Sequence, residues 1–194
     1  MFKYSKLDYD NFYSSEHCTK ENAEIKAILD LVCCDKDTVL DLGSGTGLVA
    51  SMLGSRCHVI QVEKDPNMRL QNPYPNFFVC DAYRFVIGLM RSGKSYDHVV
   101  SVFALNYMRK GTLTLACRVA RKECVFVVYD KPYLAGSSSF YAGKRFRFRL
   151  KCSRKVRSIG EEIVRLSNDG YDVTVKNLNN EPYYKVITVR RRKP

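Results

Sequence analysis

The sequence has no tryptophan, only three histidines and no apolar run approaching the roughly 20 residues that span a bilayer. Its first eight residues also lack the apolar stretch of a signal peptide. The lack of an apolar span argues against a membrane protein, and the lack of a signal peptide argues against secretion. We therefore expect an intracellular protein, cytoplasmic or nuclear, with no membrane partner.

Closely spaced metal ligands are missing as well. The chain has eight cysteines, but no two of them form a C-x-x-C pair, and most lie inside apolar runs. A structural zinc site needs thiolate or imidazole ligands at short spacing. We expect no metal site, and we interpret the cysteines as reduced, buried thiols in a reducing compartment.

What the sequence does have is a large excess of positive charge on an ordinary globular composition. Its 194 residues are 45% hydrophobic and carry a net charge of +12. That length supports one well-buried core, so a single domain over residues 1–194 is expected. The charge favours an anionic partner such as RNA, DNA or a phosphorylated metabolite, without choosing among them.

Apolar runs and helical periodicity alternate along the first two thirds of the chain. This alternation predicts βαβ units and a parallel sheet, that is, an α/β fold. Strands are expected at 38–42, 58–63, 77–80, 96–103 and 124–129, and helices at 20–33, 48–53, 67–70, 84–90 and 113–119. A helix over 159–166 should follow, then two strands, 171–176 and 183–190, whose short connection favours an antiparallel pair.

A glycine-rich loop, residues 41–47, joins the first expected strand to the next helix. It reads Asp-Leu-Gly-Ser-Gly-Thr-Gly, and Leu48 follows, so it lacks the Gly-Lys-Ser/Thr ending of a Walker A loop. Its glycines are also one residue too close for the G-x-G-x-x-G dinucleotide fingerprint. Asp41 would repel a pyrophosphate but suits a cationic ligand, such as the ammonium group of an amino acid. A nicotinamide-dependent oxidoreductase is therefore disfavoured.

Together with later motifs, this loop resembles the first motif of the class I S-adenosylmethionine-dependent methyltransferases. Glu63 ends the second strand, as the family's ribose-binding acid does, and Asp81-Ala82 follows the third strand, as the pair at the adenine edge does. The resemblance implies a single doubly wound, mostly parallel seven-stranded sheet with helices on both faces and an antiparallel last strand. It implies S-adenosyl-L-methionine as cofactor, S-adenosyl-L-homocysteine as product, and a cofactor site formed by Asp41, Gly43, Ser44, Gly45, Gly47, Glu63, Lys64, Met68, Asp81, Ala82, Ser101 and Phe103.

The methyl acceptor is not encoded as clearly. The prolines of the amino-methylating motif are absent after the fourth strand, where the chain reads Ala-Leu-Asn-Tyr-Met, and no cysteine nucleophile lies there. Asn106 and Tyr107 remain the candidates for a catalytic role. The residues expected on the substrate side are Tyr13 in an N-terminal helical or lid segment (1–35), Asn106, Tyr107, and Lys131, Arg145 and Arg147 in a basic insertion (131–157).

A basic ribbon, residues 144–157, lies within this insertion. Arginines alternate with phenylalanines in part of it, which is strand periodicity with one basic face. Such a face could track a phosphate backbone, RNA more than DNA, and the basic tail 190–194 would extend the positive field. The alternative is a solvated strand face and a basic tail without a nucleic-acid role.

The functional hypotheses are therefore two. The first is a methyltransferase acting on RNA, on another anionic substrate or on a small molecule. The second is a catalytically idle protein of the same fold that serves as a nucleic-acid-binding or partner subunit. In either case, the lack of an appended recognition domain is consistent with a small substrate or with a protein partner that supplies recognition.

The basic ribbon gives a direct test. Replacing Arg145, Arg147 and Arg149 with serine should weaken RNA binding and reduce its salt dependence by up to about 0.7 in log K per log salt for each lost phosphate contact. Fluorescence anisotropy with a labelled single-stranded RNA at several salt concentrations measures both. If the wild-type protein does not bind RNA at low salt, the ribbon has another role.

Overall fold

The expected α/β architecture is confirmed. The computed structural model describes residues 16–130, 159–179 and 181–192. Within them lies a seven-stranded sheet of order β3-β2-β1-β4-β5-β7-β6, in which β7 runs antiparallel to both of its neighbours. The strands are β1 (Thr38–Leu42), β2 (His58–Glu63), β3 (Phe77–Val79), β4 (Tyr96–Val102), β5 (Ala120–Tyr129), β6 (Tyr171–Leu178) and β7 (Glu181–Arg191).

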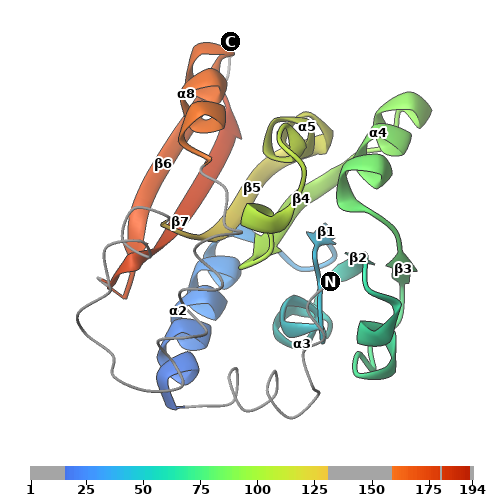
Figure 1. The fold of residues 1–194 in the computed structure, drawn as a ribbon. Coiled ribbons are helices and arrows are strands. Elements are labelled where there is room, and N and C mark those ends of the chain that lie inside the picture. Colours follow the sequence, from blue (N-terminus) through green and yellow to red (C-terminus); the bar gives the residue numbers. More distant parts are fainter. Residues whose placement is uncertain (1–15, 131–158, 180, 193–194) are drawn as a thin grey trace.

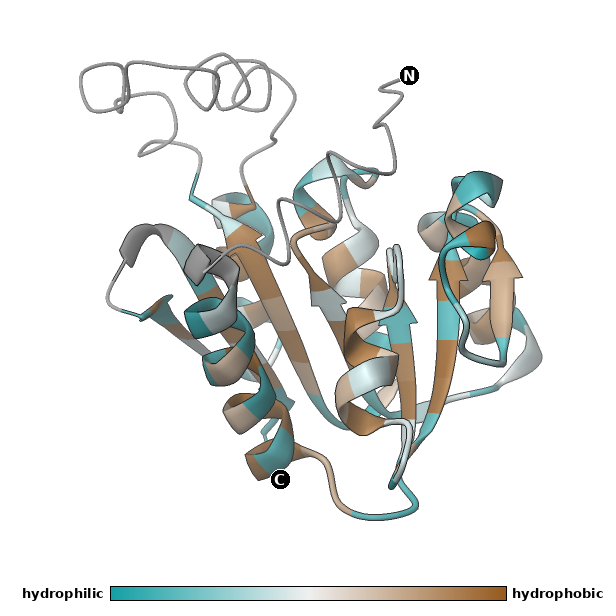
Figure 2. Ribbon diagram, turned by 90° about the horizontal axis from the view of Figure 1, so that it is seen from below, coloured by the Kyte–Doolittle hydropathy of each residue, from teal (hydrophilic) through white to brown (hydrophobic). Residues whose placement is uncertain are grey.

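Helices cover both faces of this sheet (Figure 1). One face carries α4 (Ala82–Ser92), α5 (Thr112–Val119) and α8 (Gly160–Asn168), and the other carries α2 (Glu16–Val32) and α3 (Leu48–Leu53). Two apolar cores result, one on each side of the strands. Figure 2 shows the central strands as mainly hydrophobic bands, whereas the helices show mixed polarity. None of the helices in the described part of the chain is long and apolar enough to cross a membrane.

The strand order reverses between β1 and β4. From β1 the chain winds outward to β2 and β3, and it then returns to place β4 on the other side of β1. After β1 the chain continues to β2 on one side, and after β4 it continues to β5 on the other, so the reversal falls at the carboxyl ends of β1 and β4. Open α/β sheets bind their ligands at this position.

Strand boundaries differ most at β5. The apolar run predicts a start at Cys124, but the strand begins at Ala120. Tyr96 pairs with Ala120, and Glu123 pairs with His98 on one side and Arg190 on the other. The polar start is stabilised by an ion pair between Arg190 and Glu123, at 2.6 Å, which the hydrophobic pattern does not reveal.

Asp97 fastens the same end of the sheet, where β4 begins beside β1 and β5. Its carboxylate accepts hydrogen bonds from the Thr38 amide (2.9 Å) and hydroxyl (2.8 Å), and Arg121 donates to it at 3.3 Å. Burial alone would raise the pKa of Asp97, but these bonds outweigh it and hold that pKa well below its ordinary value. The ionised carboxylate therefore stabilises the fold.

Asp97→Asn should lower the free energy of unfolding at pH 7 by about 1–3 kcal/mol, since a charged hydrogen-bond acceptor is lost. A depressed folded-state pKa contributes stability above the unfolded value of about 4 and loses it as the pH falls toward the folded value. The difference from wild type should therefore shrink below pH 4. Urea unfolding between pH 3 and pH 7 measures it.

Asp172→Asn is the matched control for that experiment. Asp172 pairs with Arg192 at 2.8 Å, but both side chains are more than half exposed. Its removal should change stability by less than about 0.5 kcal/mol. Equal effects of the two substitutions would contradict the role assigned to Asp97.

Candidate functional site

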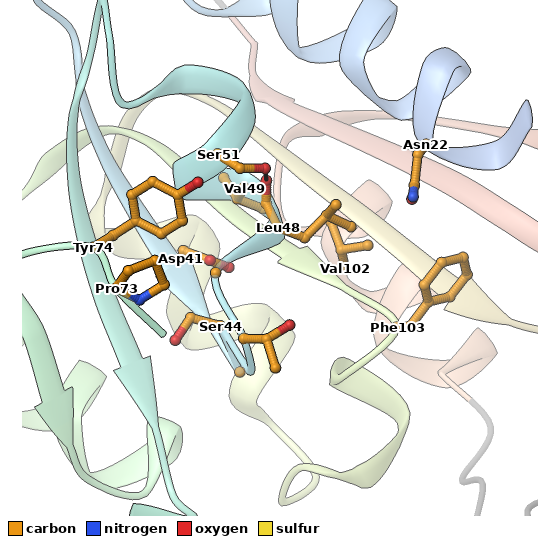
Figure 3. A pocket seen from close by; sticks show the side chains of 13 residues that line it. Asn22, Asp41, Ser44, Leu48, Val49, Ser51, Pro73, Tyr74, Val102 and Phe103 are labelled. Atoms are coloured by element: carbon orange, nitrogen blue, oxygen red, sulfur yellow. Dashed lines mark hydrogen bonds between the residues drawn. The ribbon is translucent and has the colours of Figure 1, made fainter. Parts of the chain in front are cut away.

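A cavity of about 270 Å³ lies at the carboxyl ends of β1 and β4, where the strand order reverses (Figure 3). Residues from α2, from the glycine loop and α3, from the loop after η1 (Pro66–Leu70), and from the end of β4 form its walls. They are Asn22, Asp41, Gly43, Ser44, Thr46, Gly47, Leu48, Val49, Ser51, Pro73, Tyr74, Val102 and Phe103.

The glycine loop is held against β2. The amides of Gly43 and Ser44 donate to the Val62 carbonyl at 2.8 and 3.2 Å, and the Gly45 amide donates to the Glu63 carboxylate at 3.1 Å. The other oxygen of that carboxylate accepts the amides of the two residues that follow Glu63. Glu63 is thus fixed in position before any ligand arrives.

Two of the loop glycines are required by both conformation and space. Gly43 and Gly47 have φ values of 75° and 95°, in the left-handed region that disfavours side chains. A Cβ on Gly43 would lie 2.3 Å from that of Ala104, and one on Gly47 would lie 2.7 Å from the Tyr74 ring. The loop after β4 and the loop after η1 therefore approach the glycine loop as closely as the missing side chains allow.

Asp41 is a buried carboxyl group at the floor of the cavity. The residue is 1% exposed, and its Oδ2 has no hydrogen-bond partner among the described residues. Burial, and secondarily the nearby negative charge of Glu63, raise the pKa of Asp41 to about 8. This carboxyl is therefore largely protonated at pH 7, and a cation bound beside it would favour its ionised form.

A pair of buried side-chain amides, which no sequence motif predicts, ties the loop after η1 to the glycine loop. The Asn72 amide donates to the Gly45 carbonyl (3.1 Å) and to Gln61 Oε1 (2.8 Å), and its oxygen accepts the Tyr74 amide (3.1 Å). Gln61 in turn donates to the Pro75 carbonyl at 2.9 Å. These bonds place Pro73 and Tyr74 in the cavity wall.

The end of β4 forms the opposite wall. Phe103 has φ 55°, a left-handed value for a residue with a side chain, and its amide donates to the Val127 carbonyl at 2.8 Å. Its ring packs against Tyr129 and Tyr184, each with a centroid separation of 5.3 Å. Tyr107 meets Tyr129 edge-on at 6.2 Å and is 46% exposed.

Five of the predicted cofactor residues line this cavity: Asp41, Gly43, Ser44, Gly47 and Phe103. Asp81 instead caps α4, accepting the Arg84 amide at 3.2 Å, and Ala82 begins that helix, while Met68 lies in η1. These three residues and Lys64 do not line the cavity. They follow β2 and β3, and therefore lie along the same edge of the sheet.

Two predicted site residues use their polar atoms internally. Ser101 is fully buried, and its hydroxyl donates to the Leu42 carbonyl at 2.7 Å, which joins β4 to β1. Asn106 is 1% exposed, donates to the Tyr129 carbonyl (3.1 Å) and accepts the Tyr129 amide (2.9 Å). Ser101 and Asn106 thus support the two ends of the site wall through the backbone.

The remaining predicted substrate residues, Tyr13, Lys131, Arg145 and Arg147, lie outside the described residues, as does the whole basic ribbon. In the described ranges there is no cluster of three His, Cys, Asp or Glu side chains that could hold a metal ion.

Comparison with known proteins finds a family model that matches part of the chain and solved structures that share its fold. The family model described as "Methyltransferase domain" matches residues 40–128, which run from β1 to β5. No curated protein matches the sequence. Among solved structures, the plantazolicin methyltransferase BamL in complex with a triazolic desmethylPZN analogue and SAH is similar over 96% of this chain and 89% of its own, with 13% identity and a TM-score of 0.70.

Two further structures share the fold at similar distance. The magnesium protoporphyrin IX methyltransferase from Synechocystis PCC 6803, with bound SAM, is 11% identical over 95% of this chain and 89% of its own, with a TM-score of 0.61. An rRNA methylase from Streptococcus thermophilus is 9% identical over 87% and 95%, with a TM-score of 0.60. The three names point to three different kinds of acceptor, so the fold alone does not select one.

The close approach at the glycine loop can be tested by a pair of alanine substitutions. Gly43→Ala and Gly93→Ala both place a side chain at positive φ, but a Cβ on Gly93 would meet nothing within 4 Å. Gly43→Ala should therefore cost about 1–3 kcal/mol more than Gly93→Ala, since it also overpacks the contact with Ala104. Calorimetric melting of both variants gives the comparison, and equal losses would rule out the steric constraint.

Proposed function

We propose that this chain, which has the fold of the class I S-adenosylmethionine-dependent methyltransferases, binds S-adenosylmethionine and transfers its methyl group. The observation that carries this proposal is the buried carboxyl of Asp41, with no partner for Oδ2 in the described structure, on the floor of a cavity at the strand-order reversal. A buried polar group without a partner is costly, and the ionised carboxyl needs a ligand that supplies a donor and a positive charge. The ammonium group of S-adenosylmethionine is such a donor.

The other residues on this edge fit the rest of the cofactor. Glu63 presents a carboxylate already oriented by three backbone amides, and ribose hydroxyls are donors that a carboxylate can accept. Asp81 stands at the start of α4, where its carboxylate can accept from the adenine amino group. The donor and acceptor set thus matches an amino acid, a ribose and an adenine in order along the edge.

The protein's contribution to the reaction is mainly positioning. When bound, the cofactor supplies a methyl group on a positively charged sulfur and leaves as the neutral thioether. A well-oriented acceptor can react without a strong base, because effective molarities in preorganised sites reach roughly 10⁵–10⁸ M. The Asn106–Tyr129 and Phe103–Val127 bonds hold the ends of β4 and β5 rigid, so they fix one wall against which an acceptor can be placed.

The acceptor lies among the classes that the sequence leaves open: RNA, another anionic substrate or a small molecule. The aromatic side chains of Phe103, Tyr107, Tyr129 and Tyr184 would contact an acceptor that approaches over the end of β4. The idle-subunit alternative is not favoured, because Asp41, Glu63 and Asp81 are all present and Asp41 keeps its costly buried position.

Calorimetric titration with S-adenosylmethionine, S-adenosylhomocysteine and NADH tests the proposal. Micromolar binding of the first two and none of NADH is expected. Glu63→Gln should weaken binding of S-adenosylmethionine and of S-adenosylhomocysteine by about tenfold to a hundredfold. The reason is that one carboxylate oxygen, an acceptor oriented by backbone amides, is replaced by an NH₂ group, which is a donor. No binding by the wild-type protein would overturn the proposal and move the idle-subunit alternative ahead.

A further inference from the structure

Three buried polar atoms with no hydrogen-bond partner in the described structure belong to side chains that line the same cavity. They are Asn22 Oδ1, Asp41 Oδ2 and Ser44 Oγ. Leu48, Val49, Val102 and Phe103 make much of the rest of the wall apolar. Unpaired polar atoms in such surroundings each cost roughly 1–3 kcal/mol, so their gathering around one cavity points to a polar ligand that supplies hydrogen-bond partners.

Asn22 stands apart from the other two. It lies on α2, outside the segment matched by the family model, whereas Asp41 and Ser44 belong to the strand–loop motif. Figure 3 shows Asn22 reaching into the cavity from the helix above it, across from Asp41 on β1. The helix that presents it is anchored by Ile25 and Leu29, which are 1% and 0% exposed in the core.

The chemistry of the two side chains differs in a way that matters for an amino acid. A carboxylate only accepts, so Asp41 can bind an ammonium group but repels a carboxylate. An asparagine amide both accepts through its oxygen and donates through its nitrogen. Asn22 therefore has an uncharged side chain that can form hydrogen bonds with both the ammonium group and the carboxylate of an amino acid.

We infer that Asn22 binds the amino-acid end of the cofactor, so that helix α2 closes that end of the site. This inference rests on the proposed function, and it assigns a contact that the sequence motifs do not contain. Its amide oxygen accepts from the ammonium group that Asp41 also binds, and its amide nitrogen is available to the carboxylate. Discrimination between the intact cofactor and adenosine derivatives without the amino acid then depends on α2 as well as on Asp41.

The test compares two ligands rather than relying on activity. S-adenosylhomocysteine carries the amino-acid end, whereas 5′-methylthioadenosine has the same adenosine and sulfur without it. Asn22→Ala should weaken binding of the first by about tenfold to a hundredfold in calorimetric titration. Binding of the second should stay within twofold of wild type, which also shows that the variant is folded.

Lys20→Ala is the control on the same helix. Lys20 is exposed and does not line the cavity, so both affinities should be unchanged. The inference is overturned if Asn22→Ala binds S-adenosylhomocysteine as the wild type does, or if it loses both ligands equally. Failure of the wild-type protein to bind S-adenosylhomocysteine would instead overturn the proposed function, and so the two failures are distinguishable.

Discussion

A carboxyl group buried at the end of a central strand is the constraint on which this site depends. Asp41 is almost fully shielded from water, and burial with the nearby Glu63 charge raises its pKa to about 8. The free chain thus holds a group whose charged form is disfavoured until a cation arrives. Binding energy from the ligand is therefore linked to a proton, because a cationic ligand stabilises the ionised carboxyl.

The elements around Asp41 pack closely against one another and leave the cavity beside it. The glycine loop turns back onto Val62 and Glu63, and the missing side chain of Gly43 lets Ala104 approach the loop closely. On the far side, Phe103 adopts a left-handed backbone so that its ring joins the tyrosines at the ends of β5 and β7. Local backbone strain of this kind is often kept where it shapes a binding site.

Much of the fold could be predicted because its signals are local. The strand 38–42 and the helix 48–53 occur with the expected bounds, and Glu63 ends β2 as expected. The start of β5 could not be predicted from hydrophobicity, since its polar residues are held by pairing with β7. The site divides in the same way: the motif residues could be found in sequence, but Asn22 and Asn72 could not.

The reason is that their roles come from distant partners. Nothing near Asn22 in sequence indicates that α2 crosses over the cavity, and Asn72 reads as an ordinary loop residue until Gly45 and Gln61 are seen beside it. Conversely, Ser101 and Asn106 occupy motif positions, but in this structure their polar atoms bind backbone groups. Which hydrogen-bond partner a polar side chain finds depends on the folded chain, and motif spacing alone does not predict it.

The Asn72 amide has a consequence for how this site can change over evolution or in design. The Asn72 side chain bonds to the glycine loop, to β2 and to its own loop at once. A substitution at Gln61 would therefore remove one hydrogen-bond partner of the amide that also binds the Gly45 carbonyl. Substitutions at Gln61 and Asn72 should therefore occur together. A designer who grafts only the glycine motif into another scaffold would transfer the turn without the brace that holds it in shape.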